Sequence, residues 1–217
     1  MPIPLPDPFV FPGNKENQTR HMLILDFDLD FIVRPIRRGT ADHEARYNAG
    51  NVTFWNEQVF RLFLEERLHL SQSQKIQGIV CEHHKEVFFH TQSLIKSGRL
   101  VPPLYWVHVD AHDDISGCSD NGEVSSADFL LHLIGQNWLH HIDFVLPDGE
   151  DKPPECLIRR NPLRIEFEKH CCPITFLDER EFSLKAKPDF VFLTRSPDFT
   201  PPAADFLFNL AKNYIKH

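Results

Sequence analysis

The chain has 217 residues, of which 41% are hydrophobic and 25% are charged, so it suits one globular domain with a substantial core rather than a disordered or fibrous protein. Its formal net charge of −8 argues against general binding to nucleic acid, which needs a basic surface, and is compatible with a cationic substrate. The five cysteines form no CxxC pair and no apolar run has membrane-spanning length, so we expect a cytoplasmic protein with reduced thiols and no membrane partner.

Residues 1–21 are rich in proline and polar residues and show no hydrophobic period, which predicts an extended N-terminal arm. The apolar residues Phe9, Val10 and Phe11 would let part of this arm pack against the rest of the chain. Regular patterning starts at Met22, and we therefore expect residues 22–217 to form a single α/β domain.

Three alternating aspartates follow the first predicted strand. The apolar run over residues 22–25 leads into Asp26, Asp28 and Asp30, and an extended backbone would place all three carboxylates on one face. Like charges on one face of a strand are unfavourable unless a cation lies beside them. This pattern indicates a metal site, and the alternative is an edge strand whose acidic face contacts water.

A helix is predicted over residues 53–70, where apolar side chains recur at helical spacing. A short strand over 75–80 follows, and a second helix is predicted over 86–97, ended by Gly98. Between them lies a second cluster, in which a carboxylate and two imidazoles are either metal ligands or ordinary loop residues: Cys81, Glu82, His83 and His84.

The densest cluster runs from His108 to Asp114, directly after an apolar strand over 104–107. Asp110, His112 and Asp114 alternate, so an extended backbone would place them on one face. Carboxylates and imidazoles without sulfur suit manganese or a similar divalent cation better than a structural zinc ion. The alternative is a solvated acidic loop, since short motifs often occur by chance.

The second half of the chain continues the alternation of helices and strands. Ser125 or Ser126 is expected to cap a helix over 127–135, and Pro201 and Pro202 are expected to begin a final helix that reaches about residue 214. A polar surface connection is predicted over 148–161, and strands are predicted over 140–146, 163–167, 174–177 and 189–194.

This alternation predicts an α/β fold of three layers, with a mostly parallel sheet covered by helices on both faces. Each acidic cluster stands at the carboxyl end of a predicted strand, and in such sheets that edge carries the ligand site. Three clusters at one edge would suit two cations that share bridging aspartates and activate a water molecule. The sequence contains no nucleophile elbow and no phosphate-binding glycine-rich loop that would favour another chemistry.

Asp110-Ala111-His112-Asp113-Asp114 is similar to the D-A-H-x-D motif of the ureohydrolase superfamily, which includes the arginases and agmatinases. Phe27-Asp28-Leu29-Asp30 resembles the F-D-x-D motif of that superfamily, and Glu82-His83-His84 resembles its third metal motif. Together with T-R-S-P at residues 194–197, the combination most resembles the small peptide arginases, which convert arginine to ornithine in ribosomally made peptides and release urea. The resemblance covers about residues 23–200.

The resemblance implies an arginase-like fold with two manganese ions per chain. Asp28 and Asp110 would bridge the two ions, His84 and Asp114 would complete the ligands of one, and Asp30 and His112 those of the other. His84 is preferred to its neighbour His83 because it stands two residues after the acidic residue of the motif.

Other roles follow from the same resemblance. Asp110 and His112 would take part in catalysis as well as in metal binding, while Asp26 and His108 would orient the ligands. Candidates for contacting the guanidinium group of a substrate, each with an ordinary cap or surface role as the alternative, are Glu82, Asp128 and Asp198.

The implied partner is an arginine-containing precursor peptide, and the sequence leaves the oligomeric state open. Two alternatives are an amidinohydrolase for a small guanidino compound and a catalytically silent module that binds a basic peptide. One feature departs from ordinary arginases, in which F-D-x-D follows D-A-H-x-D. Here the Phe27–Asp30 motif comes first, so the connectivity of the sheet must differ at that strand.

Overall fold

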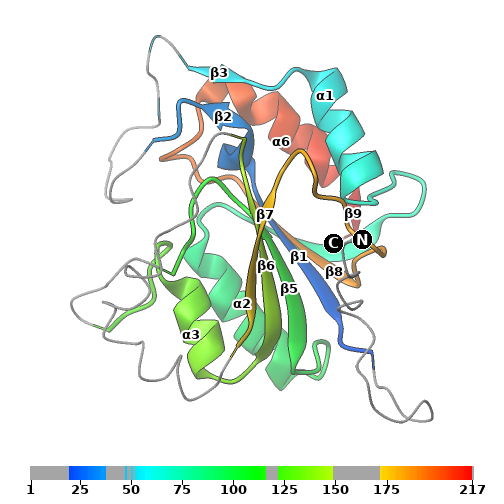
Figure 1. The fold of residues 1–217 in the computed structure, drawn as a ribbon, viewed down its shortest axis with the longest axis vertical. Helices are drawn as coiled ribbons and strands as arrows, with labels where there is room; N and C mark the ends of the chain where they lie inside the picture. Colours follow the sequence, from blue (N-terminus) through cyan, green and yellow to red (C-terminus); the bar gives the residue numbers. More distant parts are fainter. Residues whose placement is uncertain are drawn as a thin grey trace, which may run out of the picture.

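Seven parallel strands form one sheet with β1 at its centre (Figure 1). The computed structural model describes residues 20–37, 47, 50, 52–115, 122–148 and 172–216. Within them the strands of the sheet are β1 (Leu23–Asp28), β4 (Ile76–Cys81), β5 (Leu104–Val109), β6 (Leu139–Leu146), β7 (Ile174–Asp178), β8 (Phe190–Thr194) and β9 (Ile215–Lys216). Their order is β7-β6-β5-β1-β8-β4-β9, and all neighbouring pairs are parallel.

Helices cover both faces of this sheet, which confirms the predicted α/β fold. One face is covered by α1 (Glu57–Leu62), its π-helical continuation η2 (Phe63–Arg67) and α6 (Asp205–Lys212), and the other by α2 (Lys85–Lys96) and α3 (Phe129–Gly135) (Figure 1). The short elements are η1 (Leu29–Ile32), η3 (Pro202–Ala204) and the antiparallel pair β2 (Val33–Arg34) and β3 (Thr53–Phe54). No helix among the described residues is long and apolar enough to cross a membrane.

The central strand β1 is buried on both faces, and its alternation divides its side chains between two cores. Leu23, Leu25 and Phe27 pack with α1 and α6, whereas Ile24 packs with α2 and α3. Asp26 follows Ile24 on that second face, since side chains two residues apart in a strand point the same way. The alternative of an acidic edge strand in contact with water is therefore wrong, because Asp26 is completely buried.

The helix predicted over residues 53–70 is wrong at its start. Thr53 and Phe54 pair with β2 instead, and α1 begins only at Glu57. Asn56 fixes that boundary because its side-chain oxygen accepts a hydrogen bond from the backbone N–H of Val59 at 3.0 Å. Apolar spacing alone did not reveal this cap.

Most other predicted elements agree with the structure to within a few residues. The helix predicted over 86–97 is α2, and Gly98 follows it with a φ of +73°, the left-handed conformation that favours glycine. The helix predicted from residue 127 starts at Phe129 with Asp128 at its N-cap, so the predicted cap at Ser125 or Ser126 is wrong. The final helix is divided into η3 and α6. Most of the predicted arm, most of the 148–161 connection and the 163–167 strand lie outside the described residues.

Candidate metal centre

The three acidic clusters meet at one edge of the sheet, as the strand pattern predicts. β1, β4, β5 and β8 are parallel, so their carboxyl ends lie together. Asp28 at the end of β1 is in register with Thr194 of β8, which is in register with Cys81 of β4. On the other side of β1, Asp26 is in register with His108 of β5.

His84 lies at the centre of the first ligand group, at the start of α2. Its Nδ1 atom is 3.1 Å from an oxygen of Asp28 and 2.8 Å from oxygens of both Asp110 and Asp114. Its Nε2 atom is 2.9 Å from Asp26, and because a carboxylate only accepts hydrogen bonds, Nε2 carries the proton. In a neutral ring, Nδ1 therefore presents a lone pair to three carboxylates, which is the arrangement of a metal ligand.

His112 forms a second group that shares Asp110 with the first. Its Nδ1 atom is 3.0 Å from Asp30 Oδ2 and 3.4 Å from Asp110 Oδ1. Its Nε2 atom donates to the backbone carbonyl of Arg37 at 2.8 Å, which again leaves Nδ1 unprotonated in a neutral ring. Asp110 thus points one oxygen at each group, as a bridging ligand would.

Several of these buried atoms have no hydrogen-bond partner among the described residues. They are the Oδ2 atoms of Asp30, Asp110 and Asp114 and the Nε2 atom of His108. The three carboxylate oxygens lie close to Nδ1 of His84 or His112, which donates only when the ring is protonated. With neutral rings these buried oxygens have no donor, which is costly, so the arrangement suits a bound cation.

The backbone that carries these side chains is not extended, contrary to the prediction from the sequence. β5 ends at Val109, and the residues after it form bends instead of an extended strand. The backbone N–H of His112 donates to Asp110 Oδ1 at 2.7 Å, and Asp114 has a φ of +46°. Likewise, β1 ends at Asp28, so Asp30 lies in η1. The expectation of three ligands on one extended face is therefore wrong for both motifs, although the turns bring the same side chains together.

The pKa values show how strongly these groups need a positive charge. Burial, followed by the neighbouring Asp110, raises the pKa of Asp114 to about 7. Burial and the charges of Asp110 and Asp28 hold the pKa of Asp30 well above its usual range. Burial would lower the pKa of His84, but the neighbouring aspartates raise it well above its usual value. Without metal, protons must therefore supply the charge that cations would otherwise provide.

The donor atoms fit a pair of hard or borderline divalent cations. Carboxylates with imidazoles and no thiolate suit manganese, and two groups that share an aspartate suit two ions. One ion could be held by Asp28, Asp110, Asp114 and His84, and the other by Asp30, Asp110 and His112. The predicted bridging role of Asp28 would add it to the second group as well.

Residues outside the predicted ligand set support it. Ser196 Oγ donates to Asp28 Oδ2, and Trp106 Nε1 donates to Asp26 at 3.2 Å. The Phe199 ring lies against His112 with ring centroids 4.6 Å apart. Ser196 follows a predicted strand, so the sequence predicts its place at this edge. No sequence pattern predicts the contacts of Trp106 or of the Arg37 carbonyl with the site.

The three candidates for guanidinium contact have different surroundings. Glu82 is half exposed and pairs with Arg195, whose Nε atom is 2.8 Å from its carboxylate. Asp128 is buried and accepts a hydrogen bond from the backbone N–H of Ser125 at 2.8 Å. Asp198 lies 4.0 Å from Nδ1 of His83, a half-exposed side chain that belongs to none of the candidate ligand groups among the described residues.

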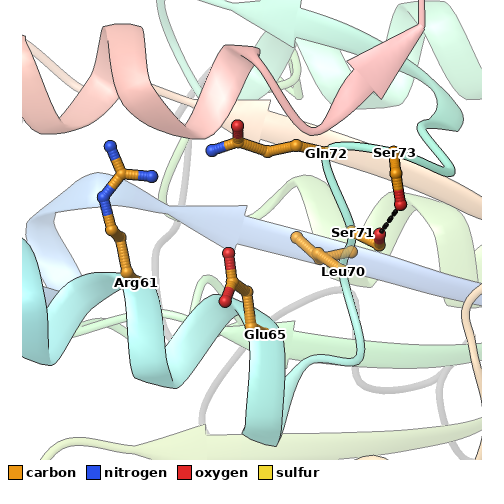
Figure 2. Close-up of a pocket in the computed structure, with 6 residues that line it drawn as sticks. All are labelled: Arg61, Glu65, Leu70, Ser71, Gln72 and Ser73. Atoms are coloured by element: carbon orange, nitrogen blue, oxygen red, sulfur yellow. Dashed lines mark hydrogen bonds between the residues drawn. The ribbon is translucent and has the colours of Figure 1, made fainter.

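An open surface pocket of about 440 Å³ lies elsewhere in the molecule. Figure 2 shows Arg61 and Glu65 extending from the α1–η2 helix toward the loop that carries Gln72, with Ser71 and Ser73 hydrogen-bonded at 3.0 Å. This loop leads into the amino end of β4, whereas the metal ligands follow carboxyl ends of strands. The pocket is therefore separate from the metal centre.

Comparison with known proteins assigns no family to this chain. No family model matches it, and no curated protein or solved structure matches it significantly. The α/β fold with a parallel sheet and a buried His/Asp cluster therefore rests on the geometry described above.

Proposed function

We propose that this protein is a manganese-dependent hydrolase that converts arginine residues of a peptide to ornithine and releases urea. The observation that supports this most strongly is the pair of groups around His84, which is buried, and His112, which is a quarter exposed, joined by Asp110. Two adjacent cation positions with carboxylate bridges are the arrangement used to activate water for attack on an electrophilic carbon.

The reaction adds water across one bond of the guanidinium group. The water oxygen bonds to the guanidinium carbon, the bond from that carbon to the side-chain nitrogen breaks, and this nitrogen leaves as the amine of ornithine after taking up a proton. Bound manganese would supply a water molecule of lowered pKa for the attack. Asp28 and Asp110 would hold the ions at a fixed separation, and Ser196 orients Asp28 through its hydrogen bond.

The acidic edge of the sheet suits a cationic substrate. A guanidinium group pairs well with a planar carboxylate, and Glu82 already pairs with the guanidinium of Arg195. We assign substrate contact to Asp198, because it stands two residues after Ser196 and beside Phe199, which contacts His112. The choice of a peptide over free arginine rests on the resemblance to the small peptide arginases.

The test uses the protein purified with manganese and an arginine-containing peptide, analysed by mass spectrometry and by a urea assay. We expect release of urea, with each modified arginine losing the mass of one cyanamide unit, and no reaction with free arginine. Turnover of free arginine or agmatine alone would instead identify a small-molecule amidinohydrolase. Bound manganese with no turnover of any guanidino substrate would identify a silent peptide-binding module.

Asp110→Asn tests whether the bridging carboxylate is required. Loss of one charged bridge to both ions is expected to lower the rate of urea release by more than about 100-fold while the fold is retained, as judged by circular dichroism. The matched control is Asp113→Asn, because Asp113 is the variable residue of the motif and its side chain caps the backbone N–H of Ile115. Equal rates for the two variants would contradict the proposed site.

A further inference from the structure

His108 faces the same space as the metal ligands, although the resemblance implies only an orienting role for it. We infer that His108 is a direct ligand of the metal position that His84 faces, so that this position has two imidazoles. The inference rests on the proposed metal-dependent function and adds a residue to its site.

The hydrogen bond of His108 fixes which ring nitrogen is free. His108 lies in β5 in register with Asp26 of β1, and its Nδ1 atom donates to Asp26 Oδ2 at 2.9 Å. In a neutral ring, Nε2 is then unprotonated and carries a lone pair. The side chain is 1% exposed, and Nε2 has no hydrogen-bond partner among the described residues.

The free nitrogen points at carboxylates that already belong to the first group. His108 Nε2 is 3.5 Å from Asp110 Oδ2 and 3.9 Å from Asp114 Oδ2. The same two oxygens are each 2.8 Å from His84 Nδ1. Ligand atoms that share an ion at about 2.0–2.2 Å from it lie roughly 3–4 Å apart, and both distances from His108 Nε2 fall in this range. His108, Asp110 and Asp114 also form one of the groups whose ligand atoms lie within 4.8 Å of one another.

Asp26 holds both imidazoles in the required orientation. One of its oxygens accepts from His84 Nε2 and the other from His108 Nδ1, both at 2.9 Å. The two rings lie nearly parallel, with centroids 5.2 Å apart and an interplanar angle of 28°. A carboxylate that fixes the proton on the far nitrogen is the usual support for a metal-bound histidine, and here one carboxylate provides it twice.

The two metal positions would then differ in their donor atoms. The first would have two imidazoles and three carboxylates, whereas the second would have one imidazole, that of His112, and three carboxylates. More nitrogen favours later metals such as cobalt over manganese. We therefore expect the first position to prefer Co²⁺ over Mn²⁺ more strongly than the second position does.

The test is proton NMR of the full chain loaded with two equivalents of Co²⁺. Each coordinated histidine has its remaining N–H in a hydrogen bond, buried and to Asp26 for two rings and part-buried and to the Arg37 carbonyl for the third, so each should give one strongly shifted exchangeable signal. We expect three such signals in the wild type and two in His108→Gln. His112→Gln should also give two, and Trp106→Phe, which removes only a donor to Asp26, should keep three.

Calorimetric titration with Co²⁺ provides a second readout. His108→Gln is expected to weaken the binding of one of the two ions by about 10- to 100-fold and to leave the other unchanged. Two shifted signals in the wild type that persist unchanged in His108→Gln would overturn the assignment, whatever the urea assay gives. Three signals without urea release from any arginine peptide would instead support His108 as a ligand and overturn the proposed function.

Discussion

Asp28, Asp110 and Asp114 bring three carboxylate oxygens within 3.1 Å of one ring nitrogen of His84, and all of these side chains are buried. One N–H cannot satisfy three acceptors. Each uncompensated buried charge costs several kcal/mol, so these residues do not serve the stability of the metal-free chain. A bound cation would compensate these charges.

Asp114 is expected to make metal binding dependent on pH. Burial and the neighbouring Asp110 raise its pKa to about 7 in the metal-free protein, so below pH 7 a proton competes with the metal for this carboxylate. We expect the affinity for Mn²⁺ to fall by about tenfold or more for each pH unit below 7. Calorimetric titration with Mn²⁺ between about pH 5.5 and about pH 8, a range that extends roughly one unit or more on each side of that pKa, measures this fall in affinity. An affinity that does not change with pH would contradict the prediction.

The close pairing of β4 with β8 positions the loop that carries His84. Gly78 of β4 is in register with Val191 of β8, and a Cβ atom on Gly78 would collide with the Val191 carbonyl and lie 2.8 Å from Ile215 Cγ2. The sheet tolerates no side chain at this point. This close contact between the backbones of β4 and β8 holds β4 in place, and with it the start of α2, where His84 lies.

Gly78→Ala is therefore expected to destabilise the fold. Overpacking of this kind costs about 1–3 kcal/mol in free energy of unfolding, which urea denaturation measures. Gly50→Ala is the matched control, since no described atom lies within 4 Å of a Cβ atom placed there, and it should change stability by less than about 0.5 kcal/mol. Equal effects of the two substitutions would show that the β4–β8 contact is not tight.

The sequence predicted the elements better than the turns that complete the site. The parallel strands place Asp28, His84 and Asp110 at one edge, because a βα alternation leaves few other arrangements. The sequence could not reveal that Asp30 lies in a 3₁₀-helix or that Asp114 adopts a positive φ. Side-chain hydrogen bonds to nearby backbone atoms form in both turns, from the Asp30 N–H to Asp28 and from the His112 N–H to Asp110. The contacts of Trp106 and of the Arg37 carbonyl depend on chain segments far apart in sequence.

The Phe27–Asp30 motif precedes the Asp110–Asp114 motif in the chain, and the strand order of the sheet still brings the two motifs together. Although β1 comes first in the chain, it lies between β5 and β8, so Asp28 and Asp30 stand beside the ligands that follow β5. Parallel strands deliver their carboxyl ends to the same edge whatever their order in the chain. The site therefore depends on the place of each strand in the sheet.

Metal removal is expected to lower the stability of the whole molecule. A ligand that binds only the folded state at about 100 times its Kd adds about 2.7 kcal/mol to the free energy of unfolding for each site. We expect EDTA to lower the Tm and added Mn²⁺ to restore it, as measured by calorimetry. In Asp30→Asn, which removes a carboxylate from the second group only, the restoration should be smaller.

The most direct measurement is the manganese content of the purified protein, determined by elemental analysis together with urea release from an arginine-containing peptide. Close to two manganese ions per chain, with urea formed from the peptide and none formed after EDTA treatment, is the predicted result. A chain that binds no divalent metal when manganese is supplied would contradict the metal centre and the function proposed for it.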